Sequence, residues 1–204
     1  MSEATIEPGE RSGSVRAPPS KSYTHRALIA GFLARRTYRI RHPSRCEDAL
    51  ATRRGIVALG TSVVGHGTEW RLLPGPEGPP ASARIDCRSS GTTLRFLAAL
   101  GATTRCRLRF TGRADLARRP IAPLLDPLAT HGATFRGPPG GASVPFSIHG
   151  PITPGKFRIA AAESSQFLSA LLLALPALAD RSDVEVVGPT VSLPYVEATR
   201  AVLR

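Results

Sequence analysis

Lysine is nearly absent from this chain of 204 residues, and aromatic side chains are scarce. Lys21 and Lys156 are the two lysines among 27 basic residues, so the net charge of +12 comes almost wholly from arginine. Such a charge suits phosphate, carboxylate or nucleic-acid ligands. Aromatic residues make up only 5% of the chain, and no long basic run is present. Few side chains are therefore available to stack on bases, which makes nucleic-acid binding a minor hypothesis.

The cysteines and the apolar segments exclude further classes of protein. Cys46, Cys87 and Cys106 are odd in number and lack CxxC spacing, so neither a disulfide framework nor a metal site is indicated. Residues 1–13 are polar and lack the apolar core of a signal peptide. The most apolar run, Phe167–Ala179, contains a proline and is too short to span a bilayer. The sequence predicts a cytoplasmic protein without membrane or metal binding.

An internal repeat organises the chain. Three Leu/Ala-rich helical runs each follow a small polar cluster, and the clusters start roughly 70 residues apart. The clusters are Ser20–Ser22, Ser89–Thr92 and Ser164–Gln166. A second helix follows in each unit, at Glu47–Leu59, Ile121–Gly132 and Pro194–Leu203. Strand-like segments separate the helices, and paired strands follow the second helix of the first two units.

Each unit therefore reads strand, helix, strand, helix, strand, strand. The sequence predicts an α/β fold of three βαβαββ units around a pseudo-threefold axis, with boundaries near 15–82, 83–155 and 156–204. The third unit stops at its second helix, so we expect it to lack its closing strands and to leave a sheet edge unpaired. This pattern favours a truncated product, a fragment or one chain of a split protein over a degenerate third unit.

The first chemical motif is residues 19–26, PSKSYTHR. It places Lys21, Ser22 and Arg26 in the opening turns of a helix. Free backbone N–H groups and the positive end of the helix dipole favour an anion there, and Ser22 and Arg26 lie one turn apart on the same face. A plain serine N-cap with solvated basic residues is the alternative explanation.

Four further helix starts carry polar or basic side chains, and each taken alone is also explained by ordinary capping. They supply Gly91 and Thr92, Arg119 before a proline, Ser164 with Ser165 and Gln166, and Ser192 with Tyr195. Together with the first motif they place five polar helix starts at equivalent positions of a repeat. If the units stack around a threefold axis, these starts converge and build an anion-binding pocket.

The residues of these motifs, and their order along the chain, also resemble those of a known enzyme family. PSKSxxxRA, SGTTLRF, RRPIxPLLDxL, SSQFLSALLLA and SxPY resemble 5-enolpyruvylshikimate-3-phosphate (EPSP) synthases from about Val15 to the C-terminus. The related UDP-N-acetylglucosamine enolpyruvyl transferases usually carry Lys-Asn where this chain has Lys21-Ser22. They also use a cysteine in the loop that matches residues 111–118, which has none here.

The resemblance implies an enolpyruvyl transferase-like inside-out α/β domain over residues 15–204, with residues 1–14 belonging to another domain of a longer enzyme. It implies transfer of the enolpyruvyl group from phosphoenolpyruvate to the 5-hydroxyl of shikimate 3-phosphate, with no metal or organic cofactor. The implied shikimate 3-phosphate ligands are Lys21, Ser22, Arg26, Ser164, Ser165, Gln166, Ser192 and Tyr195. The implied phosphoenolpyruvate ligands are Lys21, Gly91, Thr92, Arg119 and Gln166.

The resemblance also implies that the acid–base residues lie in a second domain, which a separate chain could carry, and none is expected here. The chain departs from the family pattern at Arg88 and Ser89, where Gly-Asn is usual, and at Leu193, where a basic residue is usual. Three alternatives stay open: an inactive anion-binding remnant, a UDP-N-acetylglucosamine enolpyruvyl transferase, and a relative of the RNA 3′-phosphate cyclases.

Overall fold

The middle of the chain forms the most complete structural unit. The computed structural model describes residues 4–5, 7–10, 12–75, 78–137 and 143–204. The second unit consists of β4 (Ser82–Asp86), α3 (Gly91–Ala102), β5 (Arg107–Thr111), α5 (Ala122–Thr130), β6 (Thr134–Arg136) and β7 (Phe146–His149). Its sheet has the order β4-β5-β7-β6, with β4 parallel to β5 and the other pairs antiparallel. The predicted βαβαββ order is confirmed in this unit, which also contains the unpredicted short helix α4 (Ala114–Ala117).

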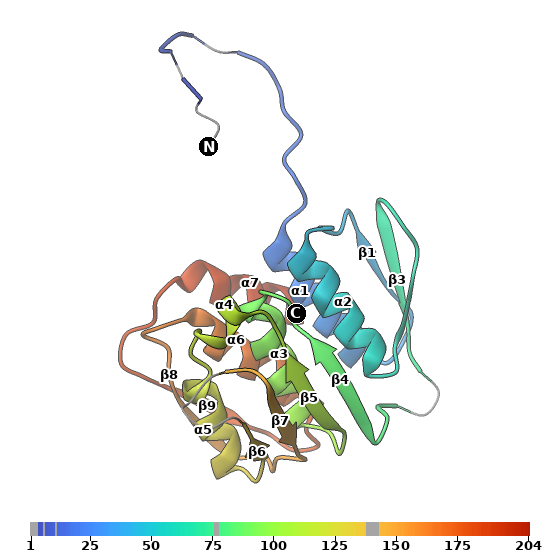
Figure 1. Cartoon of the computed structure of the whole chain (residues 1–204), viewed down its shortest axis with the longest axis vertical. Helices are drawn as coiled ribbons and strands as arrows, with labels where there is room; N and C mark the ends of the chain where they lie inside the picture. Colours follow the sequence, from blue (N-terminus) through green and yellow to red (C-terminus); the bar gives the residue numbers. More distant parts are fainter. Residues whose placement is uncertain (1–3, 6, 11, 76–77, 138–142) are drawn as a thin grey trace.

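The first unit has the same order without a leading strand. It comprises α1 (Lys21–Leu33), β1 (Tyr38–Arg41), α2 (Glu47–Ala58), β2 (Ser62–Val64) and β3 (Glu69–Leu73), and its sheet has the order β1-β3-β2. Residues 12–20 form no strand, and the side chain of Val15 is 96% exposed. Residues 12–20 instead extend away from the folded body (Figure 1). The leading strand predicted for this unit is therefore wrong, because no neighbouring strand or core packs on the segment.

The third unit holds β8 (Lys156–Ala160), α6 (Ser165–Ala174), the 3₁₀ turn η1 (Leu175–Ala177), β9 (Asp183–Val187) and α7 (Leu193–Leu203). Its sheet has two parallel strands. The helical run predicted up to Ala179 ends earlier, because Pro176 has no N–H to donate and its ring blocks a continuing α-helix. The segments Leu73–Ala83 and Arg136–Val144 are rich in Gly and Pro, which is typical of long turns. Parts of both, residues 76–77 and 138–142, lie outside the described residues.

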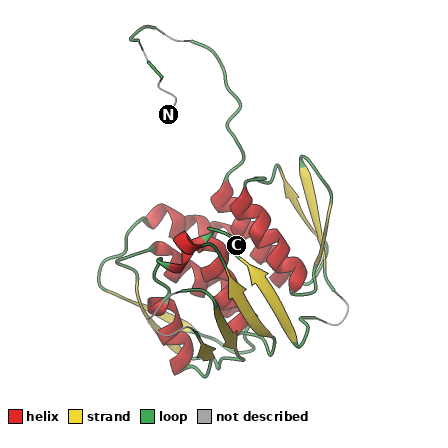
Figure 2. Ribbon diagram, viewed as in Figure 1, coloured by secondary structure: helices red, strands yellow, loops and turns green. Residues whose placement is uncertain are grey.

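The core lies where the first helices of the three units meet. Every residue of α3 except Thr92 is buried, as expected for a helix that is apolar on all sides. Helix α6 packs along α3, and α1 contacts both. The sheets lie outside this group of helices (Figures 1 and 2), with β1 and β3 packed on α1, β4 on α2, and β5 and β7 on α3. This arrangement places the N-termini of α1, α3 and α6 on one side of the molecule.

Candidate functional site

Serine side chains cap the three central helices. Ser20 Oγ accepts a hydrogen bond from Tyr23 N at 3.3 Å, Ser90 Oγ from Thr93 N at 3.1 Å, and Ser164 Oγ from Gln166 N at 3.2 Å. An extended serine followed by a helix is the usual N-cap arrangement, and it satisfies one of the backbone donors that a helix start leaves unpaired. The remaining N–H groups and the positive ends of the helix dipoles favour an anion nearby.

A pocket of about 270 Å³ lies at these helix starts. All eight residues that were predicted to bind shikimate 3-phosphate line it. They are Lys21, Ser22, Arg26, Ser164, Ser165, Gln166, Ser192 and Tyr195. Thr92 lines it as well, together with Phe96, Glu163 and Val191, which were not predicted. Residues from the first, second and third units thus share one concave surface with basic, hydroxyl and amide groups.

Arg26 is buried in the wall of this pocket, with 2% of its surface exposed. Its Nε donates to Thr199 Oγ1 at 2.7 Å, and its Nη2 donates to Tyr195 O at 2.9 Å and to Ser169 Oγ at 3.3 Å. Its Nη1 donates to Ser22 O at 2.9 Å. A guanidinium has five N–H groups, so one N–H, on Nη1, remains for a ligand. Burial lowers the pKa of Arg26 from its usual value.

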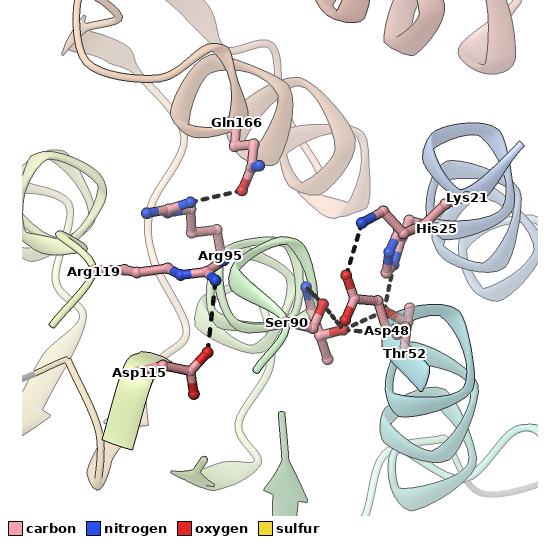
Figure 3. A network of polar contacts seen from close by, with 10 residues as sticks. Lys21, His25, Asp48, Thr52, Ser90, Arg95, Asp115, Arg119 and Gln166 are labelled. Carbon is pink, nitrogen blue, oxygen red and sulfur yellow. Dashed lines mark hydrogen bonds and ion pairs between the residues drawn. The ribbon is translucent and has the colours of Figure 1, made fainter. Parts of the chain in front are cut away.

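Lys21 forms an ion pair with Asp48 from the first turn of α2. Its Nζ lies 2.9 Å from Asp48 Oδ2 (Figure 3), and this hydrogen bond raises the pKa of Lys21. The ammonium group is therefore charged at neutral pH, and about half of the side chain is exposed. Asp48 was not predicted as a site residue. Asp48 and Lys21 are 27 residues apart and lie on different helices, so their contact becomes visible only in the fold.

A chain of hydroxyl groups connects α1, α2 and α3 beneath Lys21. His25 Nδ1 lies 2.7 Å from Thr52 Oγ1, which lies 2.8 Å from Thr93 Oγ1. Thr93 Oγ1 in turn donates to Ser90 Oγ at 2.7 Å. Burial lowers the pKa of His25 to about 4, so its ring is neutral at pH 7. Its Nε2 is buried without a hydrogen-bond partner in the part of the chain that the structure describes.

Arg95 joins the second and third units, and Figure 3 shows it between Arg119 and Gln166. Its Nη1 donates to Gln166 Oε1 and its Nη2 to Pro120 O, both at 2.7 Å. Its guanidinium also lies 4.9 Å from the centre of the Phe167 ring. Burial lowers the pKa of Arg95 to about 10. By its sequence alone Arg95 is an ordinary arginine on a helix face, and its role becomes visible only in the fold, because Gln166 and Pro120 lie in other segments.

Arg119 and Gly91 lie together, and neither lines the pocket itself. A Cβ added at Gly91 would lie 3.0 Å from Arg95 Nη1 and 3.5 Å from Arg119 Nη1, so glycine permits both arginines to approach the start of α3. About half of the Arg119 side chain is exposed, and its Nη2 lies 3.7 Å from Asp115 Oδ2. Arg119 is thus a loosely held cation beside the helix start, in contrast to Arg26.

A family model of EPSP synthase (3-phosphoshikimate 1-carboxyvinyltransferase) matches residues 6–204. The chain belongs to the EPSP synthase family. Among curated relatives, the 3-phosphoshikimate 1-carboxyvinyltransferase of Halobacterium salinarum is 37% identical over 202 residues, which are 98% of this chain and 47% of the relative. That of Methanocorpusculum labreanum is 38% identical over 196 residues, with 95% of this chain and 46% of the relative covered.

Solved structures agree with this family. An EPSP synthase from Acinetobacter baumannii superposes with a TM-score of 0.75 at 27% identity, over 91% of this chain and 42% of that one. The enolpyruvyl transferase NikO from Streptomyces tendae has a TM-score of 0.58 at 20% identity, over 89% of this chain and 42% of that one, and shows the likeness of the fold. The chain spans about half the length of the curated relatives it matches.

The positions that depart from the usual EPSP synthase pattern have local partners. Arg88 adopts a left-handed backbone with φ of +54°, and its Nε lies 3.1 Å from Asp86 Oδ2. Ser89 Oγ donates to Asp115 Oδ1 at 3.0 Å, so Ser89 and Arg119 share the Asp115 carboxylate. Leu193 is exposed at the start of α7. The Arg88 guanidinium is thereby paired with a carboxylate of its own unit.

Neither a membrane span nor a metal cluster is found within the described part of the chain. None of the helices described there combines the length and apolar character needed to cross a bilayer. Across residues 4–5, 7–10, 12–75, 78–137 and 143–204, no group of three or more His, Cys, Asp or Glu side chains is placed to hold a metal ion. The polar groups that line the pocket are arginine, lysine, hydroxyl and amide groups and the Glu163 carboxylate.

Proposed function

We propose that this chain supplies the shikimate 3-phosphate-binding half of an EPSP synthase. In that reaction the enolpyruvyl group of phosphoenolpyruvate passes to the 5-hydroxyl of shikimate 3-phosphate and phosphate is released. The observation that carries the proposal is the meeting of eight family-matched side chains in one pocket at three helix starts. A helix N-terminus with serine hydroxyls suits a phosphate, and a guanidinium suits a carboxylate.

The proposed roles follow the chemistry of each wall. Ser164 and Ser165, at the start of α6 with Ser192 nearby, bind the 3-phosphate. Ser22 and the remaining N–H of Arg26 bind the shikimate carboxylate, while Tyr195 lines the same wall. Phosphoenolpyruvate is bound by Lys21, Thr92 and Gln166 on the pocket side and by Gly91 and Arg119 beside it. Cations at this position stabilise the charge of the leaving phosphate.

The acid–base groups are proposed to come from elsewhere. Glu163 is the one carboxylate among the residues that line the pocket, whereas the reaction needs a base for the hydroxyl and an acid for the methylene carbon. We assign residues 15–204 to one cytoplasmic domain of three units around a local threefold axis. Residues 1–14 are assigned to a second domain, and a separate chain carrying that domain is the expected protein partner.

Calorimetry with shikimate 3-phosphate tests the binding role. The chain is expected to bind with measurable heat, and Ser165→Ala and Lys21→Ala are each expected to weaken binding at least tenfold. Ser62→Ala and Lys156→Ala are matched controls, because Ser62 is exposed on β2 and Lys156 pairs with Glu185 on another sheet. Absence of heat at millimolar ligand would contradict the pocket assignment, as would equal losses in the control variants.

A turnover assay tests whether this chain binds the substrates while another domain supplies the acid–base groups. The chain by itself is expected to release no phosphate from phosphoenolpyruvate in the presence of shikimate 3-phosphate, because a bound substrate without acid and base groups does not react. Measurable EPSP formation by the purified chain would show that its own residues supply the proton transfers. Binding without turnover, and turnover on addition of a chain carrying the other domain, is the expected pair of results.

A further inference from the structure

A second cavity lies at the other end of the same three helices. Its volume is about 530 Å³, roughly twice that of the pocket at the helix starts and within the usual range of small-molecule sites. It is lined by the end of α1, by residues 103–106 after α3, by η1 after α6 and by residues 79–81 before β4. Twelve residues of α3 separate the two cavities, a distance of about 18 Å along the helix.

One wall of this cavity is apolar and rigid. Phe32 and Leu33 come from α1, and Pro79, Pro80 and Pro176 come from the other segments. Prolines have no N–H group and a fixed φ, so this wall offers ring and methylene surfaces and little hydrogen-bonding capacity. It suits a flat, apolar ligand body.

Arg35 and Arg105 also line the cavity and give it positive charge beside the apolar wall. Neither guanidinium has a hydrogen bond or an ion pair within the described residues, in contrast to Arg26 and Arg95. The carbonyl oxygens at the end of α3 are already occupied. Leu100 O accepts from Thr103 Oγ1 at 2.8 Å, and Gly101 O accepts from Thr104 Oγ1 at 2.9 Å. The N–H groups of both arginines are therefore available to a ligand.

The backbone of Arg35 supports a role for its side chain. Arg35 follows the C-cap Ala34 of α1 and has φ of +46°, a left-handed conformation that glycine adopts most readily at the end of a helix. For a residue with a Cβ this conformation costs about 1–2 kcal/mol. A charged residue that is strained and unpaired at the edge of a cavity is better explained by what it binds than by what it stabilises.

We propose that this cavity is a second binding site, for a small aromatic molecule carrying one carboxylate. The ring packs against Phe32 and the prolines, and the carboxylate binds Arg35 and Arg105. A single negative charge is favoured over a phosphate dianion, because the negative ends of the dipoles of α1, α3 and α6 lie on this side and none of the described lining residues begins an α-helix. The chemistry differs from that of the pocket at the helix starts, where backbone donors and a lysine are present.

Titration with 2-naphthoate tests the proposal, and 2-naphthamide, which has the same ring and no charge, is the matched probe. The chain is expected to bind naphthoate at least tenfold more tightly than naphthamide, and Arg35→Gly and Arg105→Ala are each expected to remove that preference. Lys21→Ala is expected to leave naphthoate affinity unchanged. Equal affinity for the two probes, or equal affinity in the arginine variants, would overturn the proposal.

Amide chemical shifts locate the ligand. On addition of naphthoate, the signals of residues 103–106 are expected to move while those of Ser164–Gln166 stay in place, and inorganic phosphate is expected to leave residues 103–106 unmoved. Shifts confined to Ser164–Gln166 would place naphthoate in the first pocket and would overturn the assignment. This result is independent of the shikimate 3-phosphate titration, which Arg35→Gly is expected to leave unchanged.

Discussion

The two ends of α1, α3 and α6 differ in how their polar groups are used. At the N-terminal end, hydrogen bonds cross between units: Arg26 donates to residues of the third unit, and Thr93 of the second unit bonds to Thr52 of the first. At the C-terminal end, the hydroxyls of Thr103 and Thr104 bond within their own helix turn, and Arg35 and Arg105 have no hydrogen-bond or ion-pair partner among the residues that the structure describes. A cavity lies at each end, and the hydrogen bonds between units described here lie at the N-terminal end.

The cross-unit hydrogen bonds at one end contribute to folding stability, whereas the unpaired arginines at the other end are free to bind a ligand. Buried polar groups that bond across units hold the three central helices in register, and removing one leaves its partners unsatisfied. Exposed and unpaired cations contribute little to folding and remain free to bind. Substitutions of the residues that bond across units at the N-terminal end should therefore lower the free energy of unfolding. Substitutions of Arg35 and Arg105 at the C-terminal end should affect ligand binding with little change in stability.

The largest effect is expected from Arg26→Ala. Loss of the buried guanidinium removes the donor to Thr199 Oγ1 and one of the donors to Ser169 Oγ and Tyr195 O. Each hydrogen bond from a charged donor contributes about 1.5–3 kcal/mol, so the loss of several should exceed the effect of any variant below. Urea unfolding followed by circular dichroism measures the change. Arg105→Ala is the matched control, with an expected change within about 0.5 kcal/mol. Similar losses in both variants would remove the distinction between the two ends.

The second-largest effect is expected from acid, which should lower the free energy of unfolding through His25 at the N-terminal end of the helices. Burial lowers the pKa of His25 from 6.5 to about 4, so the unfolded state binds the proton more readily. The stability from the neutral ring is present above pH 6.5 and is lost as pH falls towards 4. Between pH 7 and pH 5 the expected loss is about 2 kcal/mol. Urea midpoints at both pH values measure it, and His25→Gln should abolish this part of the pH dependence. An unchanged slope in the variant would show that other groups cause it.

A smaller difference in stability is expected between variants at the two ends of α3. Ser90→Ala removes the acceptor for Thr93 N and for Thr93 Oγ1, and loss of an N-cap costs about 1 kcal/mol. Thr103→Ala, at the other end of α3, removes one hydroxyl that bonds back to its own helix and should cost less. Thermal unfolding of both variants gives the order, and a larger loss for Thr103→Ala would reverse the comparison.

The smallest effect is expected from Arg35→Gly. Glycine relieves the left-handed strain but increases the freedom of the unfolded chain by a similar free energy. The two terms oppose each other, so the net change should lie within about 0.5 kcal/mol in the same urea titration. A loss above 1 kcal/mol would show that the Arg35 side chain anchors the end of α1, in which case the C-terminal end is also held by its arginines.

The sequence predicted the helix starts well, because each carries its own signal. Ser20, Ser90 and Ser164 precede apolar runs, and all three cap their helices, which is the capping that the sequence left open as an alternative to anion binding. What depends on distant partners could not be predicted. Arg26 and Thr199 are 173 positions apart, and the role of Arg95 rests on Gln166 and Pro120. Helix α4 has four residues, too few for a helical period. The repeat pattern led us to expect a strand before α1, where the side chain of Val15 is 96% exposed.

The outer edge of β9 affects how copies of the chain behave towards one another. This strand pairs with β8 on one side, and no strand within the described residues covers its other side, where Val186 and Val187 are exposed. Unpaired edges of this kind join readily to other edges. A net charge of +12 keeps copies apart, but at 1 M salt this repulsion reaches only about 3 Å. Low ionic strength, which commonly precipitates proteins of low net charge, is thus the condition that protects this one from self-association.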